Sequence, residues 1–241
     1  MARPTLSLFM PAYNEGDKLE KNITEVLTAL NKLGLEYELF IVDDSSTDDT
    51  PKIADSLARR YKQLRVVRYE NGPSRRENLA KSFWLAGGEI ITFMDADLAT
   101  DLEALPKLVG AIQDGADIST GDRYHPDSTI KRTAYRFTVS RAANFFLRSL
   151  FGSKMRDHFC GFKAFSKKKL IPLIAQLGYD HKFVRGVSWD AELLLLAQRW
   201  RYNIVSIPIK WTESPKSTMQ VKREIKMFPH LVKLWLKSGR I

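Results

Sequence analysis

The stretch Glu89–Asp101, EIITFMDADLATD, places an apolar run directly before three carboxylates. Similar apolar runs begin at Thr5, Tyr37 and Leu64, each bounded by polar or turn-forming residues. Runs of this length with such boundaries are typical of buried strands. We therefore expect four strands in the first hundred residues.

Helical signals separate these runs. Apolar periodicity predicts a helix over Lys18–Leu33, and Ser46–Asp48 would cap a second helix over Asp49–Tyr61. A third helix is expected over Asn78–Ala86. Strands joined by helices of this length predict parallel pairing with right-handed crossovers. The expected fold class is α/β, with a Rossmann-like, mostly parallel sheet flanked by helices.

Polar motifs stand after three of the four strands. Pro11–Glu15 (PAYNE) follows the first, Asp43–Ser46 (DDSS) the second, and Asp95–Asp97 (DAD) the fourth. In doubly wound sheets, ligands bind beyond the carboxyl ends of the parallel strands. The three motifs are therefore expected at one edge of the sheet, in one binding site.

The two aspartates of the DAD motif favour a metal site. Asp95 and Asp97 alternate along the chain, so on an extended backbone their side chains point the same way across Ala96. This arrangement suits a hard divalent cation, Mg²⁺ or Mn²⁺, that also binds diphosphate oxygens. The alternative is that acids after a strand cap the next helix, which Thr100 and Asp101 could do.

The second acidic pair, Asp43 and Asp44, exceeds what a helix cap needs, although one of the two could be purely local. A carboxylate at this place can accept hydrogen bonds from a nucleobase or a ribose hydroxyl. Tyr13 could offer a stacking face to the base, with ordinary packing as the alternative.

The composition is that of a globular, enzyme-sized chain with an anionic partner. The 241 residues are 44% apolar, carry a formal charge of +10, and show no repeat or linker-like segment. The single cysteine, Cys160, excludes an intrachain disulfide and a cysteine-based metal site, which favours the cytosol. We expect neither a signal peptide nor a transmembrane helix, because no apolar run approaches about 20 residues.

Two segments of the second half mix cationic and apolar side chains. Ile130–Arg156 contains seven Lys and Arg and no acid, and 217–241 repeats the mixture around Pro229. This pattern predicts interfacial helices on an anionic membrane surface, with solvated helices packed on the sheet as the alternative. Nucleic acid is not expected, because no standard nucleic-acid motif is present and the acidic sheet edge would repel a polyanion.

A family resemblance is carried by PAYNE at 11–15, VDDSSTDDT at 42–50 and MDADLA at 94–99. In this order and spacing they resemble the nucleotide-sugar half of family 2 glycosyltransferases of the GT-A fold. Four later motifs resemble the dolichyl-phosphate glucosyl- and mannosyltransferases: GDRY at 121–124, RDHFCGFKAF at 156–165, WDAELLLLAQ at 189–198 and IPIKWTESPKST at 207–218. The WDAELLLLAQ and KWTE stretches lean towards the glucosyl type.

The resemblance covers essentially the whole chain and implies one GT-A domain over 1–241. Its parts would be a nucleotide-sugar half (1–98), an acceptor half (99–215) and an amphipathic C-terminal segment (216–241). The implied reaction is a metal-dependent, inverting transfer of glucose from UDP-glucose to a dolichyl or polyprenyl phosphate. The protein would act peripherally at the cytoplasmic face of a membrane. GDP-mannose as donor, or a non-catalytic nucleotide-sugar or lipid-phosphate binding module of the same fold, are the alternatives.

The resemblance also implies roles for single residues. The implied nucleotide contacts are Pro11, Tyr13, Glu15, Asp43, Asp44, Arg75 and Asp95. The implied catalytic residues are Asp95, Asp97 and Arg123, with Asp95 and Asp97 holding the metal. The implied acceptor contacts are Arg123, Arg132 and Lys216.

The sequence also departs from the family pattern. Gly72–Arg76 stands where the family usually carries a Gly-Lys-Gly turn, so Arg75 would replace the lysine. Ala99 stands where mannosyl enzymes often have Gln, so it supplies no third metal contact. Asp157 and Asp190 are further acids of interest, for which ion pairs with neighbouring Arg and Lys, or helix capping at Asp190, are the alternatives to a functional role.

Overall fold

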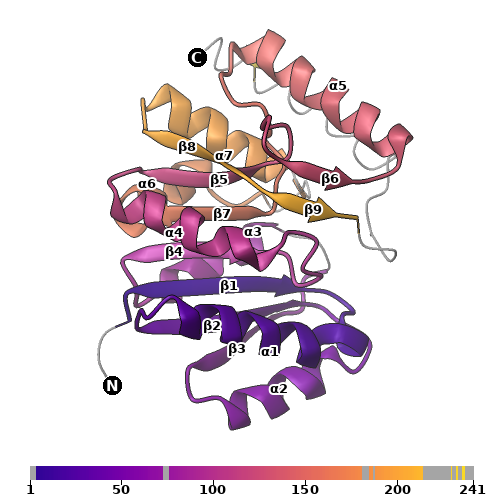
Figure 1. Ribbon diagram of the computed structural model, residues 1–241, viewed down its shortest axis with the longest axis vertical. Coiled ribbons are helices and arrows are strands. Elements are labelled where there is room, and N and C mark those ends of the chain that lie inside the picture. Colours follow the sequence, from indigo (N-terminus) through magenta and orange to yellow (C-terminus); the bar gives the residue numbers. More distant parts are fainter. Residues whose placement is uncertain are drawn as a thin grey trace.

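The computed structural model describes residues 4–72, 76–180, 185–186 and 188–213, together with positions 229, 232, 235 and 236. Figure 1 shows the strands side by side in one large sheet, with helices in front of it and behind it. The elements in chain order are β1 (Leu6–Ala12), α1 (Gly16–Lys32), β2 (Tyr37–Asp44), α2 (Thr50–Arg60), β3 (Leu64–Tyr69), α3 (Arg76–Ser82), η1 (Phe83–Leu85), β4 (Ile90–Met94), η2 (Leu102–Ala104), α4 (Leu105–Gln113), β5 (Ile118–Asp122), β6 (Thr129–Lys131), α5 (Ala134–Phe151), β7 (Phe162–Ser166), α6 (Lys167–Leu177), α7 (Ser188–Arg199), β8 (Ile204–Pro208) and β9 (Lys210–Thr212).

The large sheet has the strand order β3-β2-β1-β4-β7-β5-β8. β7 runs antiparallel to both of its neighbours, β4 and β5, whereas the other pairs of this sheet are parallel. The predicted α/β fold with a mostly parallel sheet is therefore confirmed. The four strands expected in the first hundred residues are β1 to β4.

Helices cover both faces of the sheet, as the continuous apolar runs of its central strands require. α1, α2 and α4 pack on one face, and α3, α6 and α7 pack on the other. Phe9 of β1 stacks on Phe40 of β2 with ring centroids 4.4 Å apart, and Trp189 of α7 is fully enclosed on the same side. The two cores hold the strand ends, and the loops after them, in fixed positions.

The three predicted helices form with shifted ends. α1 begins at Gly16, and α2 begins at Thr50, whose amide donates to the Asp48 carboxylate at 2.9 Å. The third is shorter than predicted, because α3 ends at Ser82 and the chain continues as a 3-10 turn to Leu85. Arg76 is the first residue of α3, which directs its side chain towards the end of β4.

A second, two-stranded sheet is attached to the loop that follows β4. β6 and β9 pair in parallel, as Figure 1 shows beside α5. Thr212 N of β9 donates to Ala99 O at 2.8 Å, and Asp101 N donates to Lys210 O at 2.9 Å. The small sheet is therefore fixed by its backbone to the loop that carries Asp97.

The basic segment Ile130–Arg156 is not one helix, because β6 covers its start. α5 follows and ends at Phe151, and the next residue, Gly152, has a φ of 73°, the left-handed conformation common after a helix. Leu147 and Phe151 of α5 pack inward against α7. No helix in the described part of the chain is long and apolar enough to cross a bilayer. The predicted segment 216–241 lies almost wholly outside the described residues.

Candidate active site

The loops after β1 and β2 brace each other at the carboxyl edge of the sheet. Asn14 N donates to Ser46 Oγ at 3.0 Å, and Thr47 N donates to Asn14 Oδ1 at 2.8 Å. Asn14 has a φ of 55°, which asparagine tolerates better than most residues. Glu15 N donates to Thr50 Oγ1 at 2.9 Å. These bonds hold the PAYNE motif, with half-buried Tyr13, against the start of α2, a role of Asn14 that the sequence did not single out.

The two acids at the end of β2 are both buried but have different partners. Asp43 accepts from Ser46 N at 3.1 Å and lies 3.4 Å from Arg68 Nε, which matches the local role given as its alternative. Asp44 accepts a hydrogen bond of 2.6 Å from Asn78 of α3. α3 is thereby tied to the end of β2. Nucleotide binding by Asp43 and Asp44 stays a prediction.

Three carboxylates, those of Glu15, Asp95 and Asp97, lie close enough near the end of β4 to influence one another. Asp97 accepts from Ala99 N at 3.1 Å, so it partly caps its own loop. Burial, and then the charge of Asp95, raise the pKa of Asp97. Burial, and then Asp97, raise the pKa of Glu15 to about 7. Such mutual repulsion marks a place that attracts a cation.

The residues present fit a metal ion only in part. Within the described ranges, no group of three or more His, Cys, Asp or Glu is arranged to hold a metal. Asp95 and Asp97 supply two carboxylates, and a hard cation can take its other oxygens from a diphosphate and water. The protein therefore fits an ion shared with a nucleotide, and a divalent cofactor stays a proposal.

Asp95 lies against the backbone of Gly161, in the loop before β7. A Cβ at position 161 would be 2.0 Å from Asp95 Oδ2 and 2.6 Å from its Cγ. Only glycine lets the carboxylate occupy this place. The sequence placed Gly161 in a motif but offered no signal for this contact.

Asp95 is also paired with a cation that the sequence did not single out. Arg76 Nη2 lies 2.9 Å from Asp95 Oδ1, and Arg76 Nε lies 3.2 Å from Asp190 Oδ2. Lys163 Nζ lies 3.2 Å from the other oxygen of Asp190. The ion-pair alternative for Asp190 is therefore confirmed. Arg75, the predicted cation of this turn, lies outside the described residues.

Arg123 is less available to an acceptor than the sequence predicts. Its Nε and Nη2 donate to the two oxygens of Asp157 at 2.7 and 2.8 Å, and both side chains are buried. Two donors of the guanidinium are thus already used, and Asp157 has the ion-pair role given as its alternative. Direct contact of Arg123 with an acceptor phosphate stays a prediction.

A cluster of arginines surrounds Trp211 of β9. The guanidinium carbons of Arg123 and Arg132 lie 5.5 and 5.1 Å from the centre of its indole ring. Glu213 pairs with Arg132 at 3.3 Å and with Arg136 at 2.9 Å. Burial, and then the charge of Arg123, lower the pKa of Arg132. Among the described residues, the cluster has three arginines and two acids and suits an anion. Lys216 lies outside the described residues.

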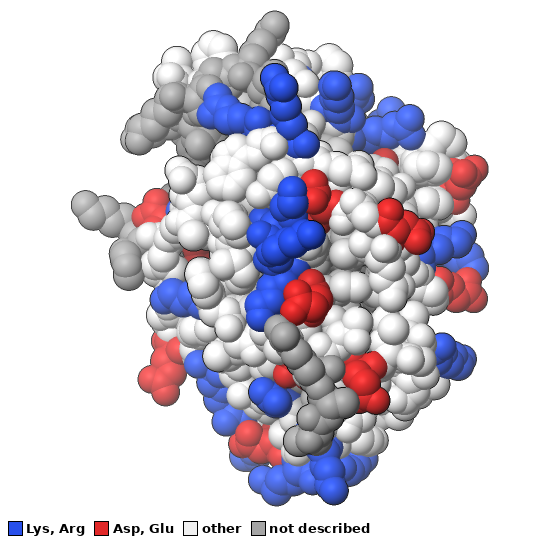
Figure 2. Space-filling view, turned by 90° about the vertical axis from the view of Figure 1, so that its left-hand side faces the viewer, with Lys and Arg blue, Asp and Glu red and all other residues white. Residues whose placement is uncertain are grey.

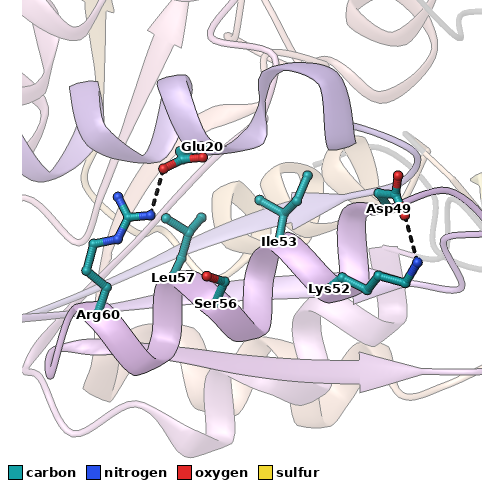
Figure 3. Close-up of a pocket in the computed structure, with 7 residues that line it drawn as sticks. All are labelled: Glu20, Asp49, Lys52, Ile53, Ser56, Leu57 and Arg60. Atoms are coloured by element: carbon teal, nitrogen blue, oxygen red, sulfur yellow. Dashed lines mark hydrogen bonds and ion pairs between the residues drawn. The ribbon is translucent and has the colours of Figure 1, made fainter.

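A surface groove elsewhere has no part in this site. It runs between α1 and α2, and Figure 3 shows ion pairs of Arg60 with Glu20 and of Lys52 with Asp49 at its two ends. None of the predicted site residues lines it. We assign it no function.

Comparison with known proteins matches residues 7–173 to the Glycosyl transferase family 2 model. The chain is 32% identical over 223 residues to Glycosyltransferase AglD of Haloferax volcanii, covering 91% of this chain and 35% of that protein. It is 29% identical to the Dolichyl-phosphate beta-glucosyltransferase of Saccharomyces cerevisiae, covering 94% and 73%. The chain thus spans about a third of the length of the first of these relatives.

Solved structures support the fold assignment. Glucosyl-3-phosphoglycerate synthase from Mycobacterium tuberculosis, in complex with Mn²⁺, UDP and glucosyl-3-phosphoglycerate, superposes with a TM-score of 0.67. The match covers all of this chain and 82% of that one, at 22% sequence identity. The predicted GT-A fold is therefore confirmed.

Proposed function

The chain belongs to glycosyl transferase family 2, and on this premise we propose that it transfers glucose from UDP-glucose to a dolichyl or related polyprenyl phosphate at a membrane surface. The names of the relatives that are dolichyl-phosphate beta-glucosyltransferases support the sugar and the acceptor. A structural neighbour that holds UDP and Mn²⁺ supports the donor. One observation carries the proposal: β9 joins the carboxylate loop of Asp97 to the arginine cluster around Trp211.

The donor would lie across the ends of β1, β2 and β4. Tyr13, Glu15 and Asp44 would contact the base and ribose, while Asp95 and Asp97 would hold a divalent cation and the diphosphate. When bound, such a cation neutralises charge that develops on the leaving nucleoside diphosphate. The mutual repulsion of the carboxylates at this edge, which helps to raise the pKa of Glu15 and of Asp97, supports that assignment.

The acceptor phosphate would bind at the arginine cluster. Asp157 pairs with Arg123, and Glu213 pairs with both Arg132 and Arg136. The group of arginines would attract a phosphate by its positive charge. Arginine suits this role because its planar donors match phosphate oxygens. Asp157 would act by fixing the position of Arg123.

The chemistry requires little more than positioning. An oxygen of the acceptor phosphate attacks the anomeric carbon from the side opposite the diphosphate, so the configuration inverts. The bond from that carbon to the diphosphate oxygen breaks, and its electron pair leaves with UDP. The attacking oxygen is already ionised at neutral pH, so the step needs no strong base. Asp190 is buried and paired with Arg76 and Lys163, so its carboxylate is not free to act as such a base.

α5 supports the membrane part of the proposal. Tyr135 and Phe145 are 64% and 69% exposed on this helix, an unusual degree for aromatic residues, and Arg141 and Arg148 are exposed on it as well. Figure 2 shows Lys and Arg mixed with Asp and Glu over much of one side of the molecule, with Lys and Arg gathered near the end where α5 lies and again at the opposite end. Aromatic and cationic side chains together suit an anionic lipid surface.

The test is a transfer assay with dolichyl phosphate in detergent, Mn²⁺ or Mg²⁺, and radiolabelled UDP-glucose or GDP-mannose. We expect label to enter the lipid from UDP-glucose. Asp97→Asn should lower the rate by about 100-fold or more, because it removes a carboxylate that would hold the cation beside the diphosphate. Asp101→Asn is the matched control, since Asp101 lies in the same loop and its side chain caps η2 by accepting from Glu103 N at 2.8 Å, which an asparagine oxygen can also do.

Three other results would revise the proposal. Transfer from GDP-mannose alone would change the donor but keep the acceptor. UDP-glucose binding without label in the lipid would exclude the polyprenyl acceptor. Equal losses in Asp97→Asn and Asp101→Asn would show that the loop, and not the carboxylate of Asp97, matters.

A further inference from the structure

Arg76 bridges two carboxylates whose environments differ sharply. Asp190 is completely buried, whereas the side chain of Asp95 is 46% exposed at the proposed diphosphate site. Arg76 itself is 13% exposed. Its guanidinium therefore spans from the protein interior to the edge of the site.

The inner end of this bridge is firmly held. Asp190 accepts from Arg76 Nε and from Lys163 Nζ, so a single buried carboxylate has two cations. The guanidinium of Arg76 and the ammonium of Lys163 lie 5.5 and 5.4 Å from the centre of the Phe93 ring. These contacts fix the guanidinium from behind and leave Nη2 directed at Asp95.

The outer end is easily exchanged. An ion pair with a half-exposed carboxylate is weak, because water screens it. A divalent cation carries twice the charge of a guanidinium and binds carboxylate oxygens directly. In the proposed function nucleotide and cation bind at Asp95, so they compete with Arg76 for that carboxylate.

We propose that Arg76 is an exchangeable counter-ion of the donor site. It neutralises Asp95 while the site is empty, and it turns its Nη groups to the diphosphate when a divalent cation takes Asp95. Asp190 and Lys163 are positioning residues that keep the guanidinium within reach of both places. The inference rests on the proposed function, because it needs a cation and a nucleoside diphosphate at Asp95 and Asp97.

The charge change of the reaction explains the value of this arrangement. When the bond between the anomeric carbon and the diphosphate breaks, the electron pair adds one negative charge to the leaving diphosphate. The acceptor phosphate loses one negative charge as it forms the new bond. A cation at the diphosphate therefore stabilises the transition state more than the bound donor, and it acts mainly on kcat.

The proposal predicts opposite effects on two binding constants. Without nucleotide, Arg76 competes with metal for Asp95, so Arg76→Gln should tighten binding of Mn²⁺ alone by about threefold to fivefold. With Mn²⁺ saturating, the same change should weaken UDP binding by about tenfold or more, because a charged hydrogen bond to the diphosphate is lost. A merely structural role would weaken both.

The experiment titrates the whole chain with Mn²⁺ alone, and then with UDP at saturating Mn²⁺. Isothermal titration calorimetry measures both dissociation constants. Arg60→Gln is the matched control, since it breaks an ion pair of 2.7 Å with Glu20 in the groove between α1 and α2, which holds none of the proposed site residues. Arg76→Lys keeps the charge but lacks the planar fork. It should give intermediate UDP affinity, which guards against a folding defect in Arg76→Gln; thermal melts check all variants.

Each outcome decides the matter. Opposite shifts in Arg76→Gln, with none in Arg60→Gln, support the exchange. Parallel losses, or no change, overturn it. If Arg76→Gln shows these opposite shifts but the wild-type protein transfers no sugar to lipid, the exchange stands and the acceptor assignment fails. If wild type binds neither, both proposals fall.

Discussion

Replacement of Gly161 by alanine should disable the site without unfolding the protein. The new Cβ would lie 2.0 Å from Asp95 Oδ2, whereas ordinary contacts begin at 3.4 Å, so the carboxylate must move by more than 1 Å. The backbone at position 161 has no positive φ that would add strain, so the effect comes from space alone. A displacement of about 1 Å at a reacting centre costs on the order of 100-fold in rate.

The stability cost should be small. Asp95 is half exposed and can turn to solvent, at the loss of its ion pair with Arg76, which is worth about 1 kcal/mol or less. The melting temperature of a domain of this size should therefore fall by no more than about 4 °C. We expect Mn²⁺-dependent UDP binding and glucose transfer to drop together, measured by calorimetry and the radiolabel assay.

Gly110→Ala is the matched control. Gly110 lies in α4, has no positive φ, and a Cβ there would meet no atom within 4 Å. Alanine should leave binding and transfer unchanged and raise stability by up to about 1 kcal/mol through its helix propensity. The reasoning is refuted if Gly161→Ala folds and keeps wild-type UDP binding and transfer, because the position of Asp95 would then be unimportant.

Three further perturbations test other parts of the molecule. Asp157→Asn should lower the free energy of unfolding by about 3 to 5 kcal/mol in urea titration, because it leaves the buried Arg123 without a counter-charge; an unchanged midpoint would contradict this. Burial lowers the pKa of His158 from its ordinary 6.5 to about 4, so below pH 6.5 the unfolded state takes up a proton that the native state does not. Stability should therefore fall by about 2 kcal/mol between pH 7 and pH 5, and urea titrations of His158→Gln should show a smaller fall; an equal fall would exclude His158 as the cause. Phe145→Asp should reduce flotation with vesicles rich in anionic lipid, whereas Trp84→Asp, which removes a 59% exposed aromatic residue outside α5, should not; equal behaviour would remove α5 as the membrane face.

The sheet could be predicted because local chemistry marks its strand ends. Apolar runs that stop at Asp43 and Asp95 read as buried strands followed by a polar edge, and both strands form there. The direction of β7 could not be predicted, since a short run such as Phe162–Ser166 pairs equally well either way in sequence terms. The direction of β7 is set by its pairing with β4 and β5, which forms only in the folded protein.

The candidate site was predicted better in its acids than in its bases. An acid after a strand has a position set by the backbone, whereas the partner of a long basic side chain can lie anywhere in the chain. Asp157 is 34 residues from Arg123, and Asp190 is 114 residues from Arg76. The pattern of charges therefore showed a surplus of cations, but it did not show that Arg123 is buried or that Arg76 reaches Asp95.

The short strand β9 has a consequence for how such a domain can diversify. It is joined to β6 and to the loop after β4 by backbone hydrogen bonds, at Thr129, Lys210, Thr212, Ala99 and Asp101. Backbone bonds of this kind survive most changes of side chain. Selection could therefore replace the side chains of β6 and β9, and with them the acceptor recognised, while the donor loop keeps its place. Single substitutions in these strands would change the acceptor that is recognised and leave the structure of the donor half unchanged.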